Sequence, residues 1–123
     1  MPYPLDAVIQ EHPSGCGIAA CAALARVSYR ESRTIANRLG IHAEDQALWS
    51  DTRYVARLLH ALALEAAPPE AFAGWDTLPD RALLAIRWRL ENRRAFWHWV
   101  VFARDGGDAR VLDSKRALKH NLR

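Results

Sequence analysis

The sequence predicts an α+β fold, with helices in the first half packed on an antiparallel sheet formed by the second half. Apolar residues recur at helical spacing over about 14–66, the prolines at 68 and 69 interrupt that pattern, and apolar strand-like runs follow over about 80–114. Helices that precede strands, instead of alternating with them, favour α+β over α/β. Because the chain has 123 residues and half of them are apolar, we expect a single domain over residues 1–123.

The first two helices are expected before residue 41. The segment Cys16–Ala25 is rich in alanine and apolar on all sides, which is typical of a buried helix. The second helix is expected over Tyr29–Leu39. Ser28 and Glu31 have the spacing of a capping box at its start, and Gly40 is a natural stop at its end.

A third helix is expected to carry an apolar stripe over Tyr54–Leu62. Ser50, Asp51 or Thr52 could cap its first turn, because each of these side chains can accept a hydrogen bond from the helix N-terminus. The segment Ala66–Pro69 ends the helical part, and irregular structure is expected from there to about residue 79.

Three strands are expected after residue 80. The first is Ala82–Trp88, and the other two, Phe96–Arg104 and Ala109–Asp113, flank an Asp-Gly-Gly-Asp turn that is typical of a hairpin. Trp97 and Trp99 alternate with the residue between them, so both indoles are expected on one face, packed against the helices. Either indole is also a candidate wall of a substrate groove.

The overall composition argues against several classes of protein. A net charge of +3 is only mildly basic, and the one basic cluster is Lys115–Arg123, so binding to nucleic acid is not expected. Two cysteines make no disulfide framework, and together with the histidines they fit no metal-ligand spacing, so neither a metal nor another cofactor is expected. We see no signal peptide and no apolar run long enough for a membrane span, which predicts a cytoplasmic protein. Export by an unrecognised route stays open.

Cys16 is the candidate nucleophile. Pro13 and Gly15 predict a turn before it, so its sulfur is expected at a helix N-terminus, where the helix dipole and unpaired N–H groups lower the pKa of a thiol. Gly17 would let a substrate approach the backbone closely. The alternative is that Cys16 is a small buried hydrophobe, as we expect for Cys21.

His98 is the candidate base, because it begins the most apolar strand of the chain. If the hairpin closes symmetrically around its two glycines, Asp113 faces Val100, and His98 and Asp113 are diagonal neighbours on one face. The carboxylate could then orient the imidazole. A buried histidine bound to a backbone carbonyl is the alternative. The other histidines lack such a partner, and His12 is expected in a surface loop: His12, His42, His60 and His120.

Gln10 stands six residues before Cys16, in the pattern Gln-x5-Cys-Gly-x-Ala. With a later His that opens an apolar strand and an Asp fifteen residues further on, the pattern resembles the double-glycine peptidases, which are papain-like cysteine peptidases that remove bacteriocin leader peptides. The resemblance runs from about residue 8 to residue 114. It implies a papain-like fold and a catalytic triad, with Cys16 as nucleophile, His98 as general base and Asp113 as orienting acid. It also implies that Gln10 donates to the oxyanion hole.

The activity implied by the resemblance is that of a thiol protease, a hydrolase that cleaves a peptide or protein substrate through a thiolate–imidazolium pair and an acyl-enzyme. The chain departs from the family at Gly15, where Asp is usual, and at Ser114, where Pro is usual. It also lacks the membrane spans and the Walker A motif of the exporter form. Two alternatives stay open: a protein glutamine deamidase or other amide hydrolase or transferase on the same fold, and a non-catalytic domain that binds peptides.

Overall fold

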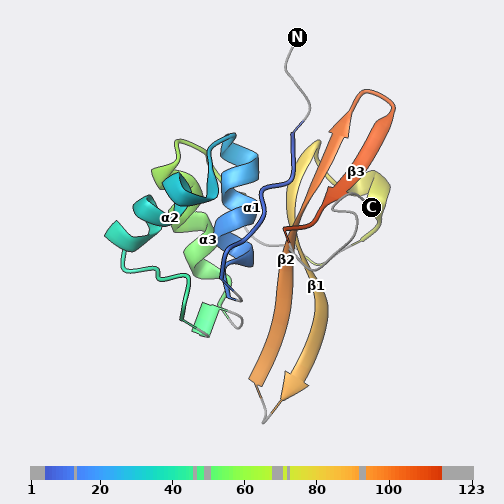
Figure 1. Ribbon diagram of the computed structural model, residues 1–123. Coiled ribbons are helices and arrows are strands. Elements are labelled where there is room, and N and C mark those ends of the chain that lie inside the picture. Colours follow the sequence, from blue (N-terminus) through green and yellow to red (C-terminus); the bar gives the residue numbers. More distant parts are fainter. Residues whose placement is uncertain are drawn as a thin grey trace.

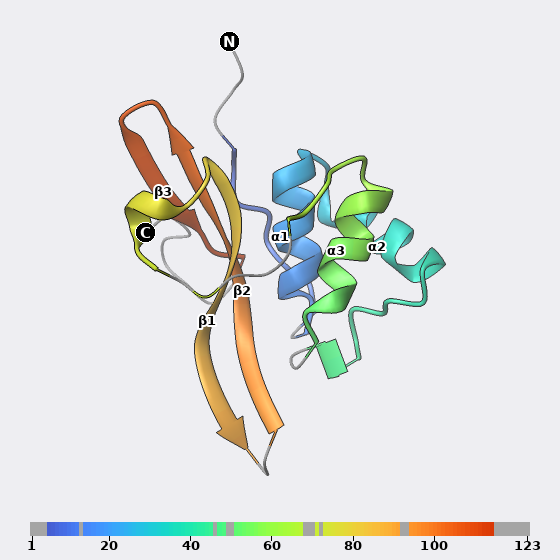
Figure 2. The same cartoon turned by 180° about the vertical axis from the view of Figure 1, so that it is seen from behind.

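The computed structural model describes residues 5–12, 14–45, 47–48, 51–67, 71, 73–91 and 94–114. Three helices pack on a three-stranded antiparallel sheet, which confirms the predicted α+β class (Figures 1 and 2). None of the helices in this part of the chain is long and apolar enough to cross a membrane. The elements follow in the order α1 (Cys16–Ala25), α2 (Tyr29–Arg38), α3 (Arg53–Ala61), a 3-10 turn (Trp75–Thr77), β1 (Arg81–Glu91), β2 (Arg94–Asp105) and β3 (Asp108–Leu112).

Helix α1 lies at the centre, between the sheet and the other two helices (Figure 1). Its residues from Cys16 to Ala23 are all buried, because small side chains let α2, α3 and β2 approach it on different sides. The bounds agree with the predicted helix. Arg26 adopts a left-handed conformation with φ of 59° directly after the last turn, and this ends the helix.

The capping predictions for the other helices are largely confirmed. The Ser28 hydroxyl accepts a hydrogen bond from the N–H of Glu31 at 3.0 Å, so α2 begins as expected. Helix α2 ends at Arg38, one residue before the predicted end, and Gly40 follows with a positive φ of 80°. At the start of α3, Thr52 occupies the N-cap position but makes no capping bond with its side chain, and a carboxylate oxygen of Asp51 accepts from the N–H of Arg53 at 2.8 Å instead. Ser50, another expected cap, lies outside the described residues.

The sheet has the order β1-β2-β3, and the register of its second hairpin is the one predicted. Val101 pairs with Leu112 and Asp105 pairs with Asp108, so the turn closes symmetrically around the two glycines. Strands β1 and β2 are longer than expected, since the hairpin that they form extends beyond the helices (Figure 1). There the pairing of the two backbones defines the strands without a continuous apolar run, which is why the sequence pattern missed these ends.

Strand β2 is buried on both faces. Trp99, Val101 and Ala103 belong to the core that includes α1. On the opposite face Phe102 is 2% exposed, and the 3-10 turn covers it, with the rings of Trp75 and Phe102 5.9 Å apart. His98 alternates with Trp97 and Trp99 along this strand, so it lies on the same face as Phe102, and its side chain is partly buried.

Candidate active site

Cys16 is the first residue of α1, and its sulfur faces three backbone donors. The N–H groups of Cys16, Gly17 and Trp99 point at the sulfur and favour the thiolate, as predicted for a helix N-terminus. Cys16 is only 2% exposed, however, and this burial raises the pKa of the thiol more than the donors lower it. The negative charge of Asp113 acts in the same direction. The predicted lowering of the pKa is therefore wrong for this structure, in which the thiol carries its proton at neutral pH.

The positions on either side of Cys16 are glycines, and a tyrosine hydroxyl lies against each of them. A side chain at position 17 would overlap the hydroxyl of Tyr54, and one at position 15 would overlap the hydroxyl of Tyr29. Gly17 was expected to leave room for a substrate, but Tyr54 occupies that space. Gly15, where the resembling family usually has Asp, is explained in the same way, because a carboxylate there would displace Tyr29.

His98 and Asp113 form the predicted pair. Nε2 of His98 lies 2.8 Å from Oδ1 of Asp113, whose side chain is fully buried. Asp113 directly follows the last residue of β3, so the confirmed register places it diagonally from His98. The next residue of β2, Trp99, directs its backbone N–H at the sulfur of Cys16. The His98–Asp113 pair is thus linked to the thiol through the backbone N–H of Trp99 and the charge of Asp113.

Gln10 links the turn before Cys16 to the segment after Asp113. Its N–H donates to the carbonyl of Ser114 at 2.9 Å, and its Oε1 accepts from the Ser114 hydroxyl at 2.8 Å. Its Nε2 donates to the carbonyl of His12, in the turn that leads into α1. Ser114, where the resembling family usually has Pro, therefore supplies a hydroxyl that holds the amide of Gln10.

A polar cluster fixes the turn that precedes Cys16. Nδ1 of His12 lies 2.9 Å from the hydroxyl of Tyr29, and Nε2 lies 3.5 Å from a carboxylate oxygen of Glu44. Ser14 donates to the carbonyl of Ala43 at 2.7 Å. His12 was expected in a surface loop, but it is half-buried and holds this turn against α2. Burial raises the pKa of Tyr29 to about 12, so its hydroxyl keeps its proton.

The remaining sequence candidates lie apart from this site. Cys21 is fully buried, its sulfur lies 3.8 Å from the carbonyl of Val55, and burial alone raises the pKa of its thiol, as expected for a core residue. His42 and His60 are exposed, and His120 falls outside the described residues. Over the ranges that the structure covers, no cluster of His, Cys, Asp and Glu could hold a metal ion.

For two side chains near Cys16, the sequence analysis did not predict the buried polar atoms that the structure shows. Tyr54 was assigned to an apolar helical stripe, and Trp99 was expected mainly to pack against the helices. Both do pack in the core, but the Tyr54 hydroxyl and the Trp99 indole N–H are buried without a hydrogen bond to any described residue. The apolar spacing gave no signal of these polar atoms, because it records only which face is buried.

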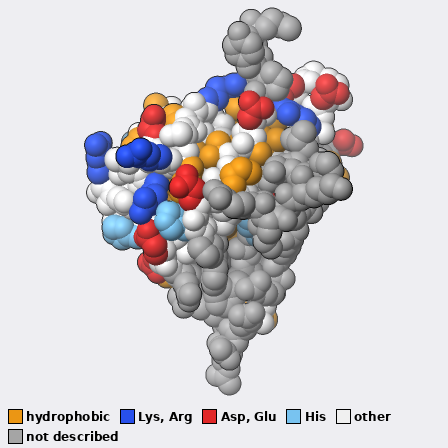
Figure 3. All heavy atoms as spheres, viewed as in Figure 1, with side chains coloured by type: hydrophobic (Ala, Val, Ile, Leu, Met, Phe, Trp, Pro, Cys, Tyr) orange, Lys and Arg blue, Asp and Glu red, His pale blue; other side chains and the backbone are white. Residues whose placement is uncertain are grey.

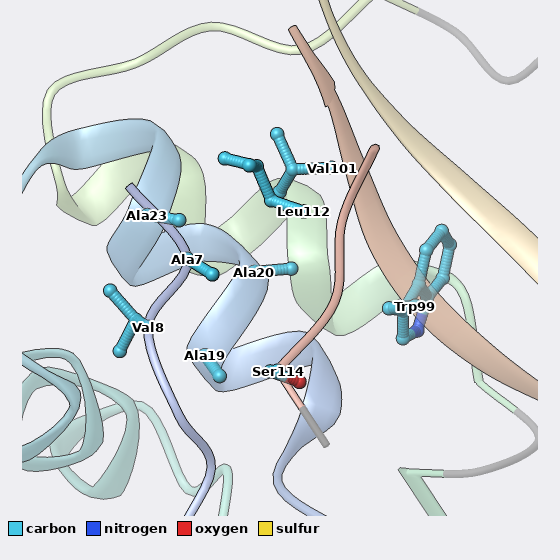
Figure 4. Close-up of a pocket in the computed structure, with 9 residues that line it drawn as sticks. All are labelled: Ala7, Val8, Ala19, Ala20, Ala23, Trp99, Val101, Leu112 and Ser114. Atoms are coloured by element: carbon cyan, nitrogen blue, oxygen red, sulfur yellow. The ribbon is translucent and has the colours of Figure 1, made fainter. Parts of the chain in front are cut away.

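A small cavity adjoins the site but does not serve as a substrate groove. It lies between α1, the segment before it and the end of β3, and small apolar side chains line it together with Trp99 and Ser114 (Figure 4). Its size suits a water molecule, not a peptide. On the outer surface, acidic and basic side chains are mixed over the described part of the helical side (Figure 3). This view shows no continuous basic face there.

Comparison with known proteins does not place the chain in a family. None of the protein-family models, curated proteins or solved structures compared with it matches. The functional argument therefore depends on the geometry around Cys16.

Proposed function

We propose that the protein is a cysteine-nucleophile hydrolase, and specifically a papain-like cysteine peptidase that acts on peptides or proteins. Cys16 is the nucleophile, His98 the general base and Asp113 the group that orients the imidazole. The observation that carries this proposal is the 2.8 Å contact between His98 and the fully buried Asp113. The residue after His98 in β2 is Trp99, whose backbone N–H faces the Cys16 sulfur.

The buried carboxylate fixes the tautomer of His98. An ionised Asp113 accepts a hydrogen bond from Nε2–H, so the proton of the neutral ring resides on Nε2 and the lone pair on Nδ1. Nδ1 makes no hydrogen bond within the described part of the chain. It is therefore the nitrogen that accepts the proton of the Cys16 thiol.

Acyl transfer then proceeds from a protonated thiol. As the sulfur of Cys16 attacks the substrate carbonyl carbon, His98 takes the thiol proton, and the carbonyl oxygen becomes an oxyanion that the N–H of Cys16 and the amide of Gln10 can hold. The tetrahedral intermediate expels the amine, which takes the proton from His98, and a thioester remains. His98 next removes a proton from water, whose oxygen displaces the thioester, and the proton returns to the sulfur.

The arrangement also supports the resemblance noted in the sequence. A cysteine at the N-terminus of a helix faces a strand that carries the histidine, and the aspartate follows the next strand, which is the order of a papain-like site. Removal of a leader peptide is the substrate assignment that goes with this resemblance. Gly15 and Ser114 both depart from the family pattern, yet each has its own contacts near the site, with Tyr29 and with Gln10.

Wild type, Cys16→Ala and Cys21→Ala, incubated with a peptide library and analysed by mass spectrometry, test the proposal. Wild type and Cys21→Ala should cleave the same peptides, whereas Cys16→Ala should cleave none while keeping its fold. Cys21 is the matched control because it is the other buried thiol of α1. A small gain in mass without cleavage would replace the peptidase by a deamidase. If wild type left every peptide unchanged, the hydrolase proposal would be overturned.

A further inference from the structure

Three buried donors occur on the helix-facing side of β2 and at the start of α3. They are the hydroxyl of Tyr54 and the indole N–H groups of Trp97 and Trp99, and none of them makes a hydrogen bond to the residues that the structure describes. Tyr54 is 3% exposed and Trp99 is 7% exposed. Buried donors in folded proteins nearly always have an acceptor. Three such donors on neighbouring side chains therefore indicate a ligand that brings acceptors of its own.

The donors surround the point where chemistry is expected. The hydroxyl of Tyr54 reaches the first turn of α1, where it leaves room for no side chain at position 17. Position 17 directly follows Cys16, so this hydroxyl lies against the residue next to the candidate nucleophile. The backbone of Trp99 faces the same sulfur. Tyr54 of α3 and the backbone of Trp99 in β2 thus both approach the first turn of α1.

The Tyr54 hydroxyl and the Trp99 indole do not satisfy one another. The indole N–H is directed toward the hydroxyl and favours its ionised form, but the two groups do not meet the geometry of a hydrogen bond. Burial is the larger influence and raises the pKa of Tyr54 well above its usual value, so the hydroxyl keeps a proton to donate. Trp97 lies edge-on to Trp99, with ring centroids 6.2 Å apart, and continues the row of donors along β2.

We propose that Tyr54 and Trp99 bind a carbonyl oxygen in the acyl part of the substrate, and that Trp97 binds a further carbonyl along the same chain. The substrate class is then an extended peptide, since a single side-chain amide offers only one carbonyl to this row. The inference rests on the proposed function, because it is the acyl-enzyme step at Cys16 that places a carbonyl between these donors.

A short peptide aldehyde is the probe, because it adds reversibly to a catalytic thiol and forms a tetrahedral adduct without any need for hydrolysis. Tyr54→Phe should bind the aldehyde about tenfold more weakly than wild type, the loss expected for one hydrogen bond to a bound oxygen. Tyr29→Phe is the matched control, since Tyr29 is also buried beside a glycine that flanks Cys16, but its hydroxyl already contacts His12. Its aldehyde affinity should stay within twofold of wild type.

A second reagent separates hydrogen bonding from access to the thiol. Methyl methanethiosulfonate has no carbonyl, so its rate of reaction with Cys16 should be equal in wild type and Tyr54→Phe. The thermal midpoint of Tyr54→Phe should not fall, because the substitution removes a buried hydroxyl that has no acceptor. If Tyr54→Phe lowered the aldehyde affinity and the rate of thiosulfonate reaction by the same factor, Tyr54 would only shape the core, and the inference would be overturned.

Aldehydes of increasing length test the role of Trp97. Trp97→Phe should leave the affinity for a one-residue aldehyde unchanged and should lower the affinity for longer aldehydes. If wild type binds aldehyde and Tyr54→Phe binds it equally well, the donor inference fails while the hydrolase proposal stands. If wild type binds no aldehyde although the thiosulfonate labels Cys16, both fail.

Discussion

The two cysteines of α1 lie five residues apart in one buried helix, yet their surroundings differ in kind. Cys21 is enclosed by the core, and burial alone acts on its pKa. Cys16 is almost as buried, but three backbone N–H groups and the charge of Asp113 act on its sulfur. The comparison shows that burial does not distinguish a structural thiol from a candidate nucleophile. The distinguishing feature is polar groups arranged around a buried sulfur.

Removal of the Asp113 charge should give the largest effect, which is a loss of activity at Cys16. Asp113→Asn keeps the shape but loses the group that fixes the tautomer of His98, so kcat/KM for a cleaved peptide should fall on the order of 10³–10⁴-fold. Asp108→Asn, at the exposed hairpin turn, is the control and should keep full activity. Similar rates for wild type and Asp113→Asn would exclude this carboxylate from the mechanism.

Filling the space beside Cys16 should give the next largest effect, now on stability. Gly17→Ala forces its new methyl group against the Tyr54 hydroxyl, and overpacking of this kind costs about 1–3 kcal/mol in the free energy of unfolding. Gly107→Ala is the matched control, because nothing lies within 4 Å of a side chain there. Urea unfolding of both variants measures the difference, and equal midpoints would contradict the close approach of Tyr54.

The contact between Ser114 and Gln10 should have a smaller effect. Ser114→Ala removes a 2.8 Å hydrogen bond to the Gln10 amide, and we expect kcat/KM to fall by roughly threefold to tenfold. Ser28→Ala is an informative contrast, since it should lower stability by about 1 kcal/mol through the lost helix cap while leaving kcat/KM unchanged. A loss of activity in both variants would show that the assay reports stability alone.

The smallest expected effect concerns the pH dependence of Cys16 alkylation. Alkylation follows the thiolate, and burial raises the pKa of Cys16, so its labelling by iodoacetamide should rise only at a pH above that of an ordinary thiol. Asp113 also raises this pKa, so Asp113→Asn should move the profile to lower pH while turnover falls. Cys21 should stay unlabelled until still higher pH. A wild-type profile below the ordinary range would instead indicate a standing thiolate–imidazolium pair.

The sequence predicted the parts of the site that depend on local patterns and on strand register. Helix α1 has the expected bounds, and the hairpin arithmetic placed His98 beside Asp113 because side chains alternate regularly along a strand. The pKa of Cys16 could not be obtained in this way, since it depends on how much of the core closes over the sulfur. The approach of Tyr54 to Gly17 was missed for a related reason: it joins two helices whose packing no local pattern records.

The hydrogen bonds between Gln10 and Ser114 also bear on the order in which the protein folds. The two residues are 104 positions apart, and Arg110 reaches the carbonyl of Leu5 across a similar separation of 105. Contacts between such distant residues carry a large loop-closure entropy, so they are expected to form late in folding. During synthesis, a ribosome-bound chain has Cys16 in place long before Asp113 emerges. The contact between Gln10 and Ser114 can therefore form only after nearly the whole described chain has been translated, so the proposed site can be completed only at that stage.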